Sequence, residues 1–208
     1  MTLIAIYGGS GSGKTTLAEE LASWLGAQRS VRLDSDSYYH DLSEQSLFDR
    51  EKTNVDHPDS MDDVLLRGHL LRLINGHAID KPKYDFETHT RVGFERIEPA
   101  PIIILDGLLF MHYPDIRSLA DVKFYVSVQD DLRFIRRLQR DVKARGRTTD
   151  QVISKYLETV RPMHHVHVEP TRQWADLEVD NSGKTENALS SMIIYLKKHY
   201  PEWEFERS

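Results

Sequence analysis

Cysteine is absent from this chain of 208 residues, and so are long apolar runs. Without cysteine there can be no disulfide framework and no thiolate metal site, and the composition suits the reducing cytoplasm. The longest apolar stretch, residues 102–105 extended by 108–110, is far below the roughly 20 residues that a membrane-spanning helix requires. The chain opens on the apolar run 3–7 with no basic leader, so we expect neither a signal peptide nor a membrane span.

An excess of positive charge is also missing. The net charge is −6 and the isoelectric point is about 5.9, which disfavours a protein that binds nucleic acid or an anionic membrane surface. Any site for a polyanion must therefore be local. No repeat or low-complexity tract is visible, and the length favours one domain, which we assign to residues 1–208.

Short apolar runs alternate with longer amphipathic ones, which is the pattern of a parallel sheet whose strands are connected by helices. We expect core strands near residues 3–7, 29–34, 101–105, 121–128 and 176–180. We expect helices near residues 13–25, 61–74, 130–145, 149–160 and 184–199. The predicted fold is therefore α/β, a doubly wound parallel sheet of about five strands with helices on both faces.

The helix expected at 130–145 has the clearest pattern. Asp130 can cap its start and Gly146 can end it. One apolar stripe is made by Leu132, Ile135, Leu138 and Val142, and arginines occupy the other faces.

An irregular hairpin is expected at about residues 76–98, inserted into the α/β core. The sequence changes character there to Lys81-Pro82-Lys83-Tyr84-Asp85-Phe86, followed by residues 91–97. The insertion is a candidate specificity element.

A glycine-rich motif follows the first expected strand. It reads Gly8-Gly9-Ser10-Gly11-Ser12-Gly13-Lys14-Thr15, which fits Gly-x4-Gly-Lys-Ser/Thr, and Thr16 comes next. Glycines let backbone N–H groups turn toward phosphate oxygens, and the helix start adds its positive dipole end. We expect the loop and Thr16 to bind ATP, with Lys14 bridging the β and γ phosphates and Thr15 binding Mg²⁺. The alternative is a flexible turn that binds nothing, and chance produces such a match roughly once in a hundred chains of this length.

Carboxylates follow two strands at the sheet edge where ligands collect. Asp106 is a candidate metal ligand, although it could be an exposed turn residue before Gly107. Asp34 and Asp36 follow the second strand beside the glycine loop. A carboxylate there can accept the proton of an attacking hydroxyl or hold that hydroxyl and the metal, although one of the two acids could merely cap a turn.

Together these residues resemble the uridine kinase (uridine-cytidine kinase) family of P-loop kinases over about residues 3–180. The matching residues are the glycine loop, Asp36-Ser37-Tyr38-Tyr39, Asn54-Val55-Asp56-His57-Pro58-Asp59, Tyr84-Asp85-Phe86, His89, Arg91, Asp106-Gly107, Arg136-Arg137-Leu138-Gln139-Arg140-Asp141, Arg145-Gly146-Arg147 and Val160-Arg161-Pro162-Met163. The glycine loop alone would be weak support for a family, but this ordered series is specific.

The resemblance implies a P-loop NTPase fold and ATP-dependent phosphorylation of uridine or cytidine at the 5′-hydroxyl, a step of pyrimidine salvage. ATP and Mg²⁺ are the implied cofactors, and the partner is a small-molecule nucleoside. The resemblance also implies a homotetramer, and a helical lid at about residues 137–165.

The resemblance also assigns roles to individual side chains. Asp36 is implied to be the catalytic base and, with Thr15 and Asp106, a metal ligand. Lys14, Arg137 and Arg140 are implied to be catalytic, and Arg145 to bind ATP. The implied substrate-binding residues are Tyr39, Asp56, Tyr84, Phe86, His89, Arg137 and Arg147.

Several of these residues have a structural alternative. Tyr84 and Phe86 could form a small apolar core under the hairpin, and His89 could be an ordinary surface histidine. The arginines of the helix at 130–145 could form a solvated basic face paired with Asp130, Asp131 and Asp141, which we favour for Arg133 and Arg136. The remaining cluster, His164, His165 and His167, lacks a recognisable ligand spacing, so a helix start or a subunit contact is favoured over a metal site.

Two positions depart from the family pattern. Asp106 stands where these kinases usually have glutamate, and the loss of a methylene can turn direct metal contact into contact through water. Lys155 stands where better-known members have a substrate-contacting glutamine, so a phosphorylated or acidic acceptor is an alternative. Rival functions are a phosphoribulokinase-like or pantothenate kinase-like enzyme and a nucleotide-sensing module without catalysis, whereas the lack of an Asn-Lys-x-Asp motif disfavours a GTPase.

Overall fold

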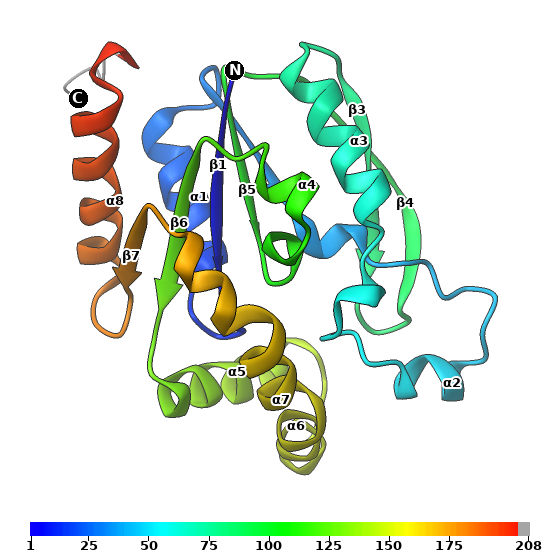
Figure 1. Ribbon diagram of the computed structural model, residues 1–208. Helices are drawn as coiled ribbons and strands as arrows, with labels where there is room; N and C mark the ends of the chain where they lie inside the picture. The colour runs from blue at the N-terminus through cyan, green and yellow to red at the C-terminus, as the bar shows by residue number, and fades with distance from the viewer. Residues whose placement is uncertain (204–208) are drawn as a thin grey trace.

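A five-stranded parallel sheet forms the centre of the computed structural model, which describes residues 1–203 (Figure 1). Its strand order is β2-β5-β1-β6-β7, and every neighbouring pair is parallel. The strands are β1 (Thr2–Gly8), β2 (Ser30–Asp34), β5 (Ile102–Gly107), β6 (Val122–Ser127) and β7 (Leu177–Asp180). All five strands were predicted, with small shifts at their ends.

Eight α-helices surround the sheet in the described residues. They are α1 (Lys14–Leu25), α2 (Leu47–Lys52), α3 (Asp63–Ile74), α4 (Pro114–Arg117), α5 (Asp130–Ala144), α6 (Thr149–Lys155), α7 (Arg161–Met163) and α8 (Thr185–His199). Short 3₁₀ turns lie at Ser35–Tyr38, Pro58–Ser60, Phe110–His112, Glu169–Trp174 and Pro201–Trp203. The five predicted helices are confirmed, whereas the short helices α2 and α4 were not predicted.

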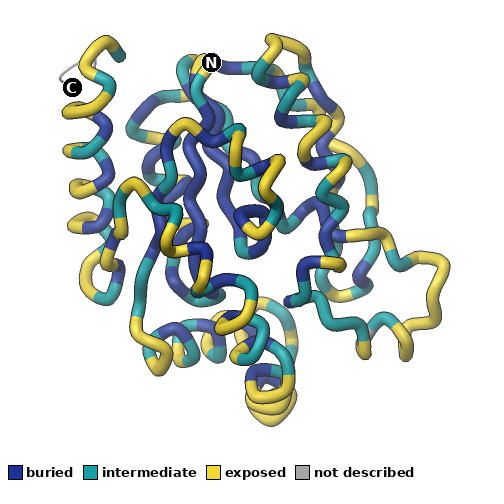
Figure 2. Tube along the Cα trace, in the orientation of Figure 1, coloured by how far each residue is buried: buried dark blue, intermediate teal, exposed yellow. Residues whose placement is uncertain are grey.

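Two apolar layers hold the helices on opposite faces of the sheet. Because side chains alternate along a strand, Ile4 and Ile6 pack with residues of α1 and α8, while Leu3 and Tyr7 pack with residues of α3 and α4. The strands are accordingly buried on both faces, and exposed residues gather on the outer helices and around α2 (Figure 2). This arrangement confirms the predicted doubly wound α/β fold.

The expected hairpin is present beside this core. Strands β3 (Ile79–Asp85) and β4 (Thr90–Ile97) pair antiparallel, with a register shift between Lys83 and Tyr84. Lys81 anchors it by donating to the Asp34 carboxylate at the end of β2. Arg91 anchors it again, donating to the Tyr39 carbonyl at 3.1 Å and to the Asp62 carboxylate at 3.0 Å.

One helical run extends much further than predicted. The helix expected at 149–160 continues through π-helical turns (Tyr156–Val160), α7, further π-helical turns (His164–Val168) and the 3₁₀ turn that ends at Trp174. Pro162 lies inside this continuous run, directly after the π-helical turns Tyr156–Val160, although a proline at this point in the sequence suggests a helix end. The expectation that His164, His165 and His167 mark a helix start is therefore wrong.

Helix α5 faces the opposite way from what its apolar pattern suggests. Ile135 and Val142 of the apolar stripe are 47% and 40% exposed, whereas Arg133, Arg137 and Asp141 are buried. The helix crosses the glycine loop rather than the apolar sheet face, so its charged side chains turn inward. The solvated-face alternative for Arg133 is wrong, although this side chain does pair with Asp130 as expected.

The predicted cap of α5 is also wrong. Gln129 occupies the N-cap position with no side-chain hydrogen bond to the helix, and the Asp130 carboxylate binds the Arg133 guanidinium instead. At the other end, Gly146 follows the C-cap residue with φ 61°, the left-handed conformation that ends a helix. Across residues 1–203, none of the helices combines the length and the apolar character that a bilayer crossing demands.

We predict that Ile104→Ala lowers the free energy of unfolding by about 2–5 kcal/mol, because Ile104 is fully buried in β5 and its truncation leaves a cavity. Ile194→Ala on α8 is the matched control, since Ile194 is 67% exposed. The control should change stability by less than about 0.5 kcal/mol. Denaturant unfolding measures both, and equal effects would contradict the placement of β5 in the core.

Candidate active site

A cavity of about 560 Å³ opens at the carboxyl edge of the sheet, between the glycine loop, the hairpin and helices α5 and α6. The predicted site residues that line it are Ser10, Gly11, Gly13, Lys14, Thr15, Thr16, Asp36, Tyr39, Asp56, Tyr84, Phe86, His89, Asp106, Arg137, Arg140, Arg145 and Arg147. Three predicted residues, Gly8, Gly9 and Ser12, lie outside this lining. The fold therefore gathers residues from positions 10 to 147 around one space.

The glycine loop joins β1 to α1 in the way its motif predicts. Gly11 and Gly13 have φ of 81° and 84°, values that side-chain-bearing residues rarely adopt. A Cβ at Gly11 would lie 2.3 Å from the Arg133 carbonyl oxygen, and one at Gly13 would lie 2.4 Å from the Asn181 side-chain nitrogen. Both positions therefore require glycine, and the backbone N–H groups of the loop are left at the start of α1, where an anion is stabilised.

Lys14 is the buried cation of the site. Its side chain is the first of α1, lines the cavity and is 7% exposed. Burial lowers the pKa of Lys14, and the nearby carboxylates of Asp36 and Asp106 act in the opposite direction. An ammonium held in this way can meet the oxygens of a phosphate without leaving the enclosure.

Asp106 has both carboxylate oxygens engaged. Thr15 Oγ1 donates to Oδ2 at 3.0 Å, and Arg32 Nε donates to Oδ1 at 2.8 Å. Burial raises the pKa of Asp106 and the Arg32 guanidinium lowers it. Asp106 is 2% exposed within β5, so the alternative of an exposed turn residue is wrong.

Arg32 was not predicted as a site residue. It lies on β2 two residues before Asp34, which pairs in register with Asp106. A basic residue inside an expected core strand is the signal that could have identified it, because such a charge requires a partner.

Asp34 and Asp36 both line the cavity, but they differ in their hydrogen bonds. Asp34 caps the 3₁₀ turn after β2, accepting from the Ser37 backbone N–H at 2.9 Å. Asp36 lines the cavity, and its buried Oδ1 has no hydrogen-bond partner among the described residues. Burial raises the pKa of Asp36, and Lys14 opposes that rise.

The side-chain oxygens beside Lys14 suit a hard cation whose remaining ligands are oxygens of phosphate and water. Thr15, Asp36 and Asp106 offer one hydroxyl and two carboxylates, and the buried oxygen of Asp36 is unsatisfied. No preformed cluster of three or more histidine, aspartate or glutamate side chains able to hold a metal is found within residues 1–203. Mg²⁺ usually binds through one or two carboxylates together with substrate phosphates and water, so these residues fit it.

The histidines near α7 are distributed differently. His164 Nε2 lies 3.3 Å from a Glu169 carboxylate oxygen, and burial together with Arg133 lowers the pKa of His164 to about 4. The rings of His57 and His112 flank His167, with centroids 4.9 and 5.1 Å away. His165 lies beside His164, with ring centroids 5.6 Å apart, so only His167 of the three points to separate surroundings.

An aromatic wall lies on the acceptor side of the cavity. The ring centroids of Tyr39 and Tyr84 are 5.5 Å apart, and those of Tyr84 and Phe86 are 5.3 Å apart. Tyr84 and Phe86 also pack against the core, so the expected minicore and a cavity wall are the same cluster. His89 is 9% exposed, with Nδ1 3.5 Å from the Tyr84 hydroxyl, so the surface-histidine alternative is wrong.

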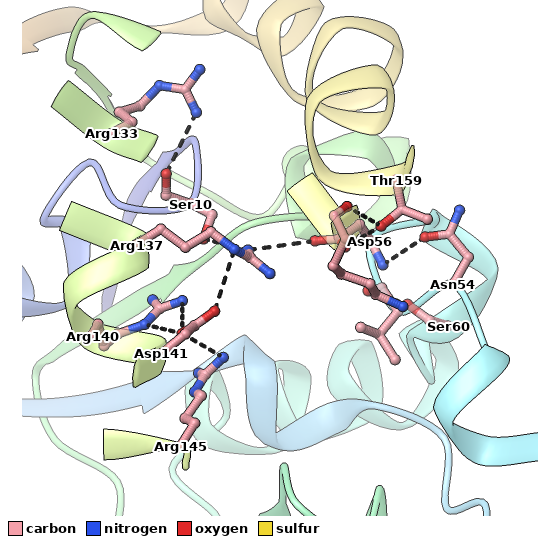
Figure 3. Close-up of polar contacts among 12 residues, drawn as sticks. Ser10, Asn54, Asp56, Ser60, Arg133, Arg137, Arg140, Asp141, Arg145 and Thr159 are labelled. Atoms are coloured by element: carbon pink, nitrogen blue, oxygen red, sulfur yellow. Dashed lines mark hydrogen bonds and ion pairs between the residues drawn. The ribbon is translucent and has the colours of Figure 1, made fainter. Parts of the chain in front are cut away.

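Asp56 faces the cavity from the loop before the Pro58–Ser60 turn. It is 5% exposed, and Thr159 Oγ1 donates to its Oδ2 at 3.3 Å (Figure 3). Arg137 Nη1 lies 4.0 Å from its Oδ1 and donates to Ser10 Oγ at 2.8 Å. Arg137 therefore connects the glycine loop with the acceptor side.

Asp141 holds the arginines of the lid together (Figure 3). Its fully buried carboxylate pairs with Arg140, Arg137, Arg145 and Arg147, at 2.9, 3.4, 3.5 and 4.0 Å. Burial would raise the pKa of Asp141, but Arg140 and Arg137 outweigh it and hold that pKa below its usual range. The alternative in which Asp141 pairs with arginines on a solvated surface is wrong, because this carboxylate is buried as their shared counterion.

Comparison with known proteins places this chain among described relatives. The model of the family described as Phosphoribulokinase / Uridine kinase family matches residues 3–188. A uridine kinase from Clostridium perfringens (strain SM101 / Type A) is 43% identical over 202 residues, 97% of this chain and 97% of that protein. Uridine kinases from Chloroflexus aggregans and Lactobacillus helveticus are 44% and 45% identical over 94% of this chain, and 94% and 93% of their own lengths.

Solved structures share the fold at low sequence identity. A phosphoribulokinase from Rhodobacter sphaeroides superposes with a TM-score of 0.63 at 14% identity, covering 90% of this chain and 74% of its own. A D-glycerate 3-kinase from Cryptococcus neoformans gives 0.59 at 17% identity, covering 86% and 84%. These similarities support the predicted P-loop kinase fold.

We predict that Asp141→Asn lowers the free energy of unfolding by about 3 kcal/mol, because it leaves buried guanidinium groups without their shared counterion. The contribution of Asp141 is complete above the usual aspartate range and is lost as pH falls through its lowered pKa. The gap between wild type and variant should therefore be constant from neutral pH to about pH 4 and shrink below it. Asp131→Asn, at an exposed carboxylate of the same helix, is the control, and an equal loss there would contradict the role of Asp141.

We also predict that the Asp36 carboxyl of the ligand-free protein titrates above the usual aspartate range, because burial disfavours its charged form. Carbon-13 NMR of the side-chain carboxyls measures this, and the resonance missing from Asp36→Asn assigns the signal. Lys14→Met should raise the pKa of Asp36 further, since Lys14 favours the carboxylate. A pKa within or below the usual range would contradict the burial of Asp36.

Proposed function

Because the chain belongs to the Phosphoribulokinase / Uridine kinase family, we propose that it transfers the γ-phosphoryl group of ATP to the 5′-hydroxyl of uridine or cytidine. The carrying observation is that Asp36, which has one buried carboxylate oxygen without a hydrogen-bond partner among the described residues, lines a cavity together with Lys14 and an aromatic wall. Relatives named uridine kinase, at 43% identity and above over nearly the whole chain, support the same acceptor. The phosphorylation would serve pyrimidine salvage.

The donor half of the reaction is assigned to the glycine loop and the basic side chains around it. Backbone N–H groups of residues 10–13 and the start of α1 would bind the triphosphate, with Thr16 and Arg145 beside it. Lys14 would balance charge on the β and γ phosphates. Mg²⁺, held through Thr15 and Asp106 with Asp36 nearby, would neutralise phosphate charge when bound.

The acceptor half is assigned to the wall between the hairpin and the lid. A carboxylate can accept two vicinal hydroxyl protons, so Asp56 would hold the ribose 2′- and 3′-hydroxyls. Tyr39, Tyr84 and Phe86 would enclose the flat base, and His89 and Arg147 would contact polar atoms of the nucleoside. Because a tyrosine hydroxyl and an imidazole each donate or accept, both uracil and cytosine fit this wall.

The transfer requires no covalent enzyme intermediate. Asp36 would accept the 5′-hydroxyl proton as that oxygen forms a bond to the γ phosphorus, while the bond from the γ phosphorus to the β–γ bridging oxygen breaks. The products are the nucleoside 5′-monophosphate and ADP. Arg137 and Arg140 would stabilise the charge on the transferring group, a contribution that can reach roughly 10³ to 10⁵ in rate.

The cytoplasm is the proposed site of this reaction, and a small molecule the proposed partner. The absence of cysteine supports a reducing compartment. A homotetramer remains our prediction from the family resemblance, and the exposed apolar stripe of α5 is a surface that assembly could cover.

We predict that Asp36→Asn lowers kcat by roughly 10² to 10⁴ while the Kd for ATP changes little, because the variant loses the proton acceptor and keeps the glycine loop. ADP release with ATP and Mg²⁺ measures turnover against uridine, cytidine, ribulose 5-phosphate and pantothenate. Asp115→Asn, at an exposed carboxylate on α4, is the control and should behave as wild type. Unchanged turnover in Asp36→Asn would remove Asp36 from the mechanism, and a rate only with ribulose 5-phosphate or pantothenate would overturn the nucleoside assignment.

A further inference from the structure

The loop that carries Asp56 is tied to the lid by two side chains one helical turn apart. Lys155 Nζ, at the end of α6, donates to the backbone carbonyl of Thr53 at 3.3 Å. Thr159 Oγ1, in the π-helical turns that follow, donates to Asp56 Oδ2 at 3.3 Å (Figure 3). The same hydroxyl lies closer, at 3.0 Å, to the Lys155 carbonyl, so its single proton is shared between this intrahelical acceptor and Asp56.

The other hydrogen bonds of residues 53–57 are local. Asn54 Oδ1 accepts from the Asp56 N–H at 3.2 Å, and the N–H groups of Val55 and His57 reach Thr53 and Asn54. Such turns shape a loop but do not fix where it lies relative to the rest of the site. Among the hydrogen bonds and ion pairs of the described residues, those from Lys155, Thr159 and Arg137 connect residues 53–57 to other parts of the site.

The Lys155 ammonium is hydrogen-bonded to the loop at residues 53–57. It is half-buried and lines the cavity, but its ammonium is directed to a backbone carbonyl. Burial lowers the pKa of Lys155 and the Asp56 carboxylate raises it, which puts the two side chains in the same electrostatic environment. A glutamine at this position could donate to the substrate through its amide, whereas the Lys155 ammonium directs one of its three N–H groups to the loop.

We propose that Lys155 and Thr159 are positioning residues that hold residues 53–56 so that Asp56 presents its carboxylate to the acceptor. We call these two contacts the clamp. The inference rests on the proposed function, because it gives Asp56 the vicinal hydroxyls of a nucleoside to bind. A carboxylate held in place before binding loses less freedom when the diol arrives, so the clamp contributes to acceptor affinity and not to the chemical step.

Steady-state kinetics with uridine tests the clamp. Thr159→Val and Lys155→Met should each raise the KM for uridine roughly 5- to 30-fold, with kcat within about threefold and the KM for ATP unchanged. Thr159→Ser keeps the hydroxyl and should restore the wild-type KM. Lys198→Met, at an exposed lysine of α8, is the control for the loss of a positive charge.

Two comparisons separate positioning from direct contact with the base. A residue that acts through Asp56 should change uridine and cytidine alike and should matter less for 2′-deoxyuridine, which lacks the diol. Adding Thr159→Val to Asp56→Asn should then produce no further loss, because residues acting as a unit are not additive. A changed ratio of uridine to cytidine, or additive losses in the double variant, would overturn the clamp.

Amide hydrogen exchange provides a readout that does not depend on turnover. In Lys155→Met and Thr159→Val, the amides of Val55 and His57 should exchange at least roughly threefold faster, with β1 and β5 unchanged. Unaltered exchange at those amides would overturn the clamp whatever the substrate is. If the wild type phosphorylates no nucleoside, the proposed function fails while the exchange result still decides the clamp.

Discussion

At the carboxyl edge of the parallel sheet, one lysine and two aspartates lie close together away from water. The rest of the site depends on the need to balance these buried charges. Lys14 lies there with Asp36 and Asp106, largely withdrawn from water. Buried charges are costly unless each has a partner, so the neighbours of this group are strongly restricted. Arg32 and Thr15 satisfy Asp106, whereas one oxygen of Asp36 stays unsatisfied.

The same requirement explains the unusual direction of α5. A helix lying over a phosphate-binding loop must bring cations toward it, and those cations in turn need a counterion when they are buried. Arg133 and Arg137 face inward for the first reason, and Asp141 faces inward for the second. Ile135 and Val142 are left exposed while Leu132, Phe134 and Leu138 are only half-buried, which departs from the usual amphipathic arrangement. Charge balance therefore decided the orientation that hydrophobicity decides in most helices.

The two walls of the cavity differ in composition, and polar side-chain contacts connect them. The donor wall consists of backbone and fixed charge around the glycine loop. The acceptor wall consists of aromatic rings on an inserted hairpin, anchored by Lys81 and Arg91. Arg137 contacts both walls through Ser10 and Asp56, so one side chain of α5 connects them. Such a connection suits a reaction in which two substrates must meet in line.

The local sequence pattern was enough to predict those elements whose conformation depends on residues close in sequence. Apolar alternation determined the strands, and the glycine spacing determined the phosphate loop, because both depend on backbone conformation within a few residues. The residues alone could not decide which of Asp34 and Asp36 caps the turn after β2, which side of α5 is buried, or that Arg32 binds Asp106. Each of these depends on contacts between segments far apart in the chain. Only the tertiary structure settles them, since burial and charge pairing are properties of the assembled neighbourhood and not of the residue.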